Sequence, residues 1–425
     1  MNLGGSGRSR HRPDRAPTFR SFVSRNFRLF FTGQLVSQVG NWLTTIATTL
    51  FVLHLTGSAI AIGVLTACQF APILLFGLWA GVLIDRSDKR RLLLGTQVVA
   101  ALQSVALAVL AFSGSPPLVA IYAVALVGGF VVAVDSTTRR AFVVELVDED
   151  LVTNAVSLNS ALMTSARVVG PVVAGVLVAL FGYGWCFSID ALSYIGPMIA
   201  LSLMRTSELR RAPVAERAKR QIRDGIAYVR TVPELWLPLT MTAIISTFTL
   251  NFQVVMPLLV TDSFSSTETA FTVLFSVLSI GSFLGALWMA RRITLHLTQT
   301  VITATLLGGA TLALAAAPTL AFAFPIALVM GLGMTAFITS GTANMQVAAD
   351  PEKRGRVLAL QGVVLLGSTP IGGPILGIVC QTWGARAGLV VGGVAALVAA
   401  AFGYWVTSRR TVPHPVELDA IVPGT

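Results

Sequence analysis

The stretch Gly77-Leu-Trp-Ala-Gly-Val-Leu-Ile-Asp-Arg-Ser-Asp-Lys-Arg-Arg91 joins two long apolar segments through a short charged loop. Its last seven residues carry six charges, four of them basic. Because short loops rich in Lys and Arg resist translocation, the flanking segments are predicted to be membrane spans that meet on the cytoplasmic side. Gly77 and Gly81 form a small-xxx-small face that allows close helix approach. Asp85 stands at the membrane boundary, where a carboxylate suits the amino end of a neighbouring helix.

The composition of the whole chain also indicates a membrane protein. Of its 425 residues, 54% are apolar and only 12% are charged, and the mean hydropathy is +0.78. If the spans alternate in direction, 28 of the 30 Lys and Arg residues fall on one side, and only Arg167 and Arg386 do not. The pI near 10.5 therefore reflects membrane topology and does not indicate a nucleic-acid partner.

We predict an all-α membrane protein, because twelve apolar segments approach the roughly 20 residues that a helix needs to cross a bilayer. The predicted spans are 29–53, 59–84, 92–113, 117–138, 153–180, 185–204, 236–261, 268–290, 299–317, 319–347, 357–381 and 386–407. The predicted organisation is a disordered basic tail (1–28), a six-helix half (29–204), a central loop with an amphipathic helix (205–235), a second half (236–407) and a second tail (408–425). Both termini and the central loop are expected in the cytoplasm.

The two halves repeat each other. Gly170-Pro171 in the fifth span matches Gly373-Pro374 in the eleventh, 203 residues later, and Gly81 matches Gly285. Two parallel repeats of six helices place a binding site near the midplane, at the interface between the halves.

The opening stretch resembles the loop between the second and third helices of major facilitator superfamily transporters. The residues that carry the resemblance are Gly81, Asp85, Arg86, Arg90 and Arg91. The resemblance implies that they help to close the cytoplasmic side, with Asp85 facing the amino end of the eleventh helix near Arg356. Asp135 and Arg139 are expected to support this gate. The simpler interpretation is a basic loop that only fixes the topology, which would need neither the glycines nor the aspartate.

Two further segments resemble one branch of that superfamily. Residues 139–147 and 154–159 are similar to the drug:proton antiporters that include enterobactin-type siderophore exporters and macrolide-efflux proteins. Gly170, Pro171 and Gly175 resemble the Gly-Pro motif on the fifth helix of antiporters, although Ala174 replaces a glycine of that motif. The resemblance implies proton-driven export of a drug, macrolide or siderophore across a bacterial inner membrane. Uptake or facilitated diffusion by the same fold, and a receptor built on it, are the alternatives.

Polar side chains in the spans are the candidate lining of the transport path. Gln34, Gln38, Asn41 and Thr45 follow one another at steps of four, three and four residues, which is one helical face. Such a face must contact protein or a water-filled cavity, so it either lines the path or forms hydrogen bonds between helices. Candidates in the second half are Asn251, Gln253 and Gln361.

Charged side chains inside the spans are few. Arg167 lies at the centre of the fifth span, where it either anchors neighbouring helices or binds an anionic group of the substrate. Asp135 precedes Arg139 by one turn, which favours an ion pair over a proton site. Asp190 is placed shallowly at the outer end of the sixth span, as either an interfacial residue or a second proton site.

No motif for an enzyme or a cofactor is present in the sequence. The phosphate-binding Gly-x-x-x-x-Gly-Lys-Ser/Thr loop is missing, and no Cys/His cluster has the spacing of a metal site. Three cysteines do not form a disulfide framework. We therefore expect no metal and no cofactor, and the expected partners are a small-molecule substrate, protons and the lipid bilayer around a monomer.

Overall fold

The computed structural model describes residues 19–85, 87–210, 227–291, 297–350 and 353–409, without the side chains of residues 78–83 and 85. Within these ranges the chain forms helices and no strands. The helices of the first half are α1 (Arg25–Thr56), α2 (Ala59–Asp85), α3 (Lys89–Phe112), α4 (Leu118–Glu145), α5 (Val152–Ser193) and α6 (Ile195–Ser202). Those of the second half are α8 (Pro233–Phe248), α9 (Phe252–Leu258), α10 (Glu268–Ala290), α11 (Leu297–Ala316), α12 (Leu320–Ala348), α13 (Arg354–Gly367), α14 (Thr369–Trp383) and α15 (Ala385–Ser408).

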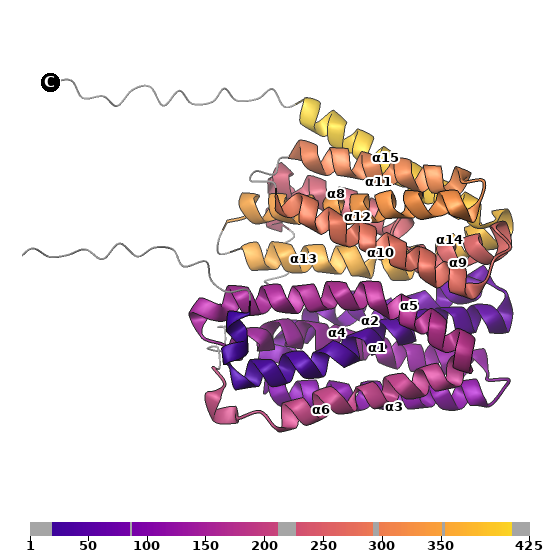
Figure 1. Ribbon diagram of the computed structural model, residues 1–425. Helices are drawn as coiled ribbons and strands as arrows, with labels where there is room; N and C mark the ends of the chain where they lie inside the picture. The colour runs from indigo at the N-terminus through magenta and orange to yellow at the C-terminus, as the bar shows by residue number, and fades with distance from the viewer. Residues whose placement is uncertain (1–18, 86, 211–226, 292–296, 351–352, 410–425) are drawn as a thin grey trace, which may run out of the picture.

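These helices make the twelve predicted passes. Ten described segments are long and apolar enough to cross a membrane, and one of them, Glu149–Ser202, contains two passes that meet at Gly182. The twelfth pass is α1, whose polar side chains lower its hydropathy. The all-α fold with two six-helix halves is therefore confirmed, and Figure 1 shows the halves as two bodies lying against each other.

Local sequence signals set several helix ends. The side chains of Ser24, Asp88 and Thr267 each accept a hydrogen bond from a backbone N–H in the first turn of α1, α3 and α10, respectively. Gly57 ends α1 in the left-handed conformation, with a φ of 57°.

Two boundaries differ from the sequence prediction. Helix α1 begins at Arg25 and a 3-10 turn covers Arg20–Val23, so the predicted disordered tail already has structure from residue 19. The reason is a contact with α5: the backbone N–H and hydroxyl of Ser21 both donate to Asn154 Oδ1, at 3.0 and 2.7 Å. The predicted loop after residue 180 is a single bend at Gly182, whose φ of 79° only glycine adopts readily.

Other predicted spans are interrupted. The seventh pass breaks between α8 and α9 at residues 249–251, and the eleventh breaks between α13 and α14 at Ser368. Most of the expected central amphipathic helix, and the greater part of both tails, lie outside the described residues.

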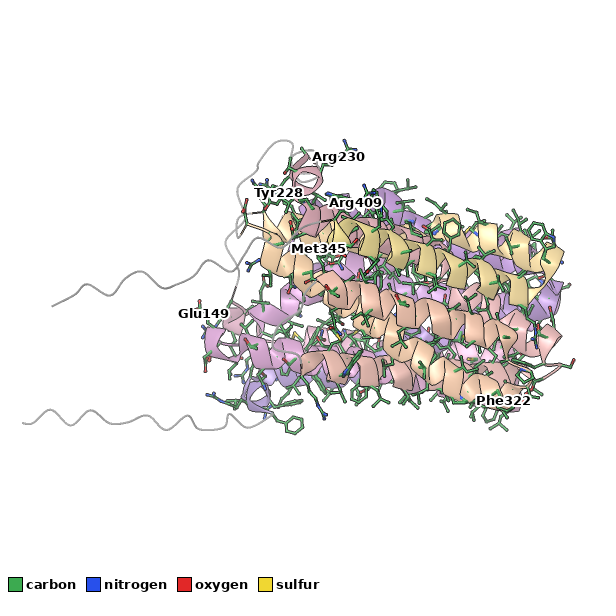
Figure 2. All side chains as sticks on the ribbon, turned by 90° about the horizontal axis from the view of Figure 1, so that it is seen from above. Glu149, Tyr228, Arg230, Phe322, Met345 and Arg409 are labelled. Atoms are coloured by element: carbon green, nitrogen blue, oxygen red, sulfur yellow. The ribbon has the colours of Figure 1, made fainter. Side chains whose placement is uncertain are left out.

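The molecule has a basic end and an opposite end. The basic end carries the helix termini near Glu149, Arg230 and Arg409, and Phe322 lies at the opposite end (Figure 2). We use these two names for the ends throughout.

The two halves pack against each other through the same pairs of helices, in accordance with the repeat. Helix α5 packs on α1 of its own half and on α10 of the other, while α13 and α14 pack on α8 of their own half and on α2 of the other. Helices α2, α5, α10 and α14 therefore form the interface between the halves.

Candidate functional site

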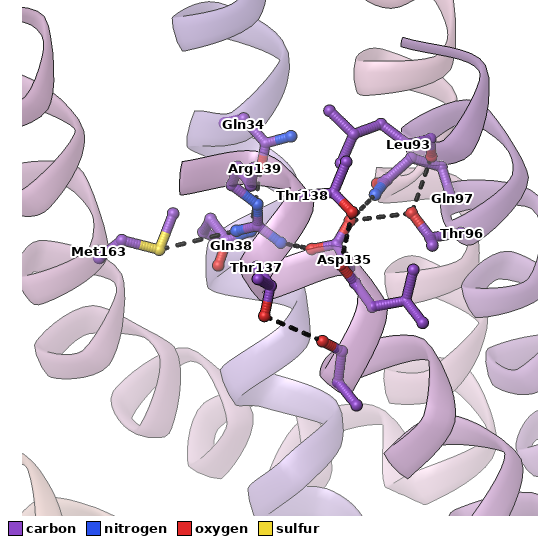
Figure 3. A network of polar contacts seen from close by, with 12 residues as sticks. Gln34, Gln38, Leu93, Thr96, Gln97, Asp135, Thr137, Thr138, Arg139 and Met163 are labelled. Atoms are coloured by element: carbon purple, nitrogen blue, oxygen red, sulfur yellow. Dashed lines mark hydrogen bonds and ion pairs between the residues drawn. The ribbon is translucent and has the colours of Figure 1, made fainter. Parts of the chain in front are cut away.

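A buried ion pair lies inside the first half, towards its basic end. Asp135 and Arg139 are one turn apart on α4 and form a salt bridge, with exposed fractions of only 5% and 8%. The other carboxylate oxygen of Asp135 accepts hydrogen bonds from Thr96 and Gln97 of α3, both at 2.9 Å (Figure 3). Arg139 also contacts the sulfur of Met163 on α5 at 3.6 Å. The pair thus ties α3, α4 and α5 together, and the ion pair suggested by the spacing is present.

The side chains on the polar face of α1 form their described hydrogen bonds within the first half. Gln38 donates to Gln34 at 2.9 Å, and both are buried beside the Arg139 network (Figure 3). Thr45 donates to the backbone carbonyl of Asn41 one turn earlier. Asn41 and Thr45 remain partly exposed, so they are the members of this face that a bound molecule could reach.

The basic loop between α2 and α3 is only partly described. Arg86 and the side chain of Asp85 lie outside the described residues, as do the surroundings of Gly81, so the predicted contact with the eleventh helix stays a prediction. Arg90 donates to the carbonyls of Leu201 and Ser202, which end α6. The backbone N–H of Arg91 donates to the Asp88 cap. The described part of the loop therefore binds within its own half.

Arg167 lies against an aromatic pair at the interface between the halves. Its guanidinium carbon is 5.4 Å from the centre of the Trp42 ring on α1, a cation–π contact. Trp42 in turn contacts Phe275 on α10 of the second half, with ring centres 6.4 Å apart. Within the described residues Arg167 forms no ion pair, and its buried Nε has no hydrogen-bond partner. A cation near the middle of the spans is thus left with free donor capacity.

The Gly-Pro motif of α5 makes room for these contacts. A side chain at Gly170 would collide with the Cβ of Trp42, and one at Gly175 would collide with Thr272 on α10. Pro171 lies in the helix between them. The motif glycines therefore allow α5 to approach α1 and α10 closely.

Asp190 is buried inside the first half. The residue is fully buried between α1, α3 and α5, while its expected shallow depth in the membrane stays a prediction. One of its carboxylate oxygens accepts from Thr44 and Ser104, both at 2.6 Å, and the other accepts from Ser193 at 3.3 Å. After the bend at Gly182, this part of α5 runs back along α1, which brings Thr44 to the carboxylate.

The candidates of the second half do not join this cluster. Asn251 donates to the carbonyls of Ser246 and Thr247 where α8 ends, and its own carbonyl oxygen has no partner. Gln361 donates to Thr342 on α12 at 2.7 Å. Gln253 is partly exposed on α9. These residues lie on the other half from Arg167, and no described contact joins them to it.

Sequence reasoning missed several residues of the interface. Trp42 follows Asn41 directly, and its position next to a polar face was the available signal. Tyr183, Glu268 and His54 meet at the opposite end, although Tyr183 and Glu268 are separated by 85 residues, and no local pattern reveals that contact.

Comparisons with known proteins agree with this architecture. Residues 16–417 match the model of a family described as transmembrane secretion effector. The chain is 33% identical over 178 residues to the staphyloferrin A transporter of Staphylococcus aureus, which covers 41% of this chain and 45% of that protein. It is also 24% identical over 352 residues to macrolide efflux protein A of Streptococcus pyogenes. That alignment covers 81% of this chain and 87% of the macrolide efflux protein. The fold is similar to the crystal structure of a bacterial homolog of the human lysosomal transporter Spinster, with a TM-score of 0.72 at 15% identity, over 92% of this chain and 98% of that one.

The Asp135–Arg139 pair yields a stability prediction. Arg139→Met should lower the stability of the first half by about 3–5 kcal/mol, because it leaves the carboxylate buried without its cation. The double variant Asp135→Leu with Arg139→Met should recover most of that loss. Thermal unfolding of the purified protein in detergent measures both. Equal melting temperatures for the single variant and the parent protein would show that the pair does not stabilise this half.

Proposed function

The chain belongs to the family of transmembrane secretion effectors within the major facilitator superfamily, and from this premise we propose that it exports small organic anions in exchange for protons. It is a membrane transporter and not an enzyme. The observation that carries the proposal is the Arg167 guanidinium, which lies on Trp42 beside the interface without an ion-pair partner among the described residues. Among the described residues, an unpaired cation near the middle of the spans is suited to binding a carboxylate or phenolate of the substrate.

The orientation follows from the charges. Since the basic residues concentrate at one end, that end lies in the cytoplasm, and the membrane is the bacterial inner membrane. The described contacts between polar side chains of the two halves are at the opposite end, where Glu268 meets Tyr183 and His54, and Ser58 meets Gln381. This form therefore keeps the outer side closed, and the substrate enters from the cytoplasm.

Arginine suits the proposed binding role chemically. Its planar guanidinium stays charged and binds the two oxygens of a carboxylate in a fork. Stacking on Trp42 fixes the plane of the group, while the unsatisfied Nε supplies a donor. The substrate would lie between Arg167 and the partly exposed Asn41 and Thr45 of α1.

The two buried aspartates differ in their capacity to carry a proton. The Asp135 carboxylate faces Arg139, so protonation would leave a buried guanidinium without its counterion. Asp190 is surrounded by three hydroxyl groups, which donate to a carboxylate and accept from a carboxylic acid equally well. Asp190 is therefore the better proton site of the two.

Binding or release of a proton at Asp190 would affect the proposed substrate site through α1. Thr44 bonds Asp190, and Gly40 leaves room for the same carboxylate, while Trp42 lies between these residues and contacts Arg167. Loss or gain of the proton changes which hydroxyl orientation is favoured, and this biases the position of α1 relative to α5.

Uptake into everted membrane vesicles tests the proposed function. Vesicles containing the protein should accumulate a carboxylate-type siderophore when energised, and an uncoupler should abolish the accumulation. Accumulation that survives the uncoupler would indicate facilitated diffusion. Uptake in right-side-out vesicles alone would indicate an importer. Uptake of a macrolide but of no anion would assign a different substrate class.

Arg167 variants test the binding role. We expect Arg167→Lys to keep part of the export of an anionic substrate and Arg167→Gln to raise KM at least tenfold, because a hydrogen bond to a charged group contributes about 1.5–3 kcal/mol. The matched control is Arg386→Gln, which removes another arginine whose contacts, two backbone carbonyls and the Phe264 ring, are all in its own half at the opposite end. If Arg167→Gln exports the anion with the parent KM, the residue is a structural anchor.

An Asp190 variant tests the coupling. Asp190→Asn keeps the shape and can still hydrogen-bond the hydroxyls, so downhill exchange of labelled for unlabelled substrate should persist while gradient-driven accumulation is lost. Asp262→Asn, at an exposed carboxylate of the opposite end, should leave both activities unchanged. Full gradient-driven accumulation by Asp190→Asn would exclude this residue as the proton carrier.

A further inference from the structure

A cluster of titratable side chains joins the two halves at the opposite end. The phenol of Tyr183 on α5 donates to Glu268 Oε2 on α10, at 2.6 Å. His54, near the end of α1, places Nδ1 3.6 Å from the other oxygen of the same carboxylate. Glu268 belongs to the second half, and the other two residues belong to the first. The carboxylate therefore bridges the halves.

The surroundings hold each member of the cluster in place. The Tyr183 ring packs on Phe51 and on the imidazole of His54, with ring centres 5.1 and 5.7 Å apart. Glu268 lies in the first turn of α10, directly after the Thr267 cap, where the helix amino end favours a negative charge. A cavity of about 360 Å³ adjoins the cluster and is lined by Leu50, Gly175, Ala179 and Thr269.

The backbones of the halves also meet in this region. Just beyond the cavity, Gly175 of α5 lies against the side chain of Thr272, one turn after Glu268 on α10. Thr272 is 1% exposed, so water does not reach this contact in the described form. Separation of α5 from α10 at the opposite end would break the Tyr183–Glu268 hydrogen bond.

We propose that Tyr183, His54 and Glu268 form a latch that sets how often the opposite end opens during transport. The proposal rests on the proposed function in so far as a transporter has to open this end to release its substrate. The latch residues position the helices and do not bind the substrate. Because the acceptor is a carboxylate at a helix amino end, the hydrogen bond is of the strong, charge-assisted kind, and its loss should favour the open form.

The labelling of a buried cysteine measures this opening directly. We would replace the three natural cysteines, Cys68, Cys186 and Cys380, with alanine and introduce Thr272→Cys. A membrane-impermeant maleimide is then added to intact cells, and its rate of reaction is compared in the presence and absence of Tyr183→Phe. This substitution keeps the ring packing and removes only the hydroxyl.

Tyr183→Phe should accelerate the labelling of the cysteine introduced at position 272 about three- to tenfold, since one charge-assisted hydrogen bond at a partly exposed site is lost. Glu268→Ala should accelerate it at least as much, because it removes the acceptor of both partners. The matched control is Tyr122→Phe, which also removes one hydroxyl donor, but from a bond to Ala61 within the first half. This control should leave the labelling rate unchanged.

A second cysteine separates opening from misfolding. Ser113→Cys lies at an exposed position of the opposite end and should react equally fast in every variant. Unchanged labelling at position 272 in both Tyr183→Phe and Glu268→Ala, with normal labelling at position 113, would overturn the latch. The assay needs neither substrate nor a proton gradient, so its result is independent of whether the proposed export is observed.

Discussion

The close approach of backbones between the two halves is the interaction on which the rest of the structure depends. Gly63 and Gly377 allow α2 and α14 to meet, and Gly175 allows α5 to meet α10. Inside a bilayer the hydrophobic effect does not drive helices together, and small residues that permit close packing take its place. At these glycines the helices meet without a large side chain between them, whereas elsewhere on the interface larger side chains such as Trp42 and Phe275 are in contact. In the proposed latch, the Tyr183–Glu268 hydrogen bond favours the form in which the opposite end is closed.

Helix α1 connects the parts of the molecule to which we assign roles. Its Gly40 and Thr44 surround Asp190, its Trp42 lies between Arg167 and Phe275, and its His54 reaches Glu268 in the second half. A small displacement of this helix would therefore change the contacts at the proposed proton site, at the proposed substrate site and at the latch. This arrangement gives a physical route for coupling without a long chain of intermediate residues.

The sequence contained enough to predict the fold, and part of the site. Segment length and hydropathy predict the twelve passes because the bilayer imposes one length on each, and the repeated Gly-Pro pair predicts the two halves. The Asp135–Arg139 pair follows from its spacing on one helix. The burial of Asp190 could not be predicted, since it depends on Thr44 of α1 and Ser104 of α3, which are far from it in the sequence. The contacts of Trp42, Tyr183 and Glu268 depend on how two halves dock, and no local spacing encodes that.

All the proposed roles require that the two ends of the molecule open alternately. Distances between spin labels test this most directly, with one pair at Ser157 and Val347 of the basic end and another at Ser113 and Phe322 of the opposite end, all on exposed positions of different halves. The cysteine-free protein in liposomes is measured at rest and during turnover, with a transported substrate and an imposed proton gradient. We expect turnover to shorten the first distance in a fraction of the molecules and to lengthen the second in the same fraction. Transport with both distances unchanged would contradict alternate opening.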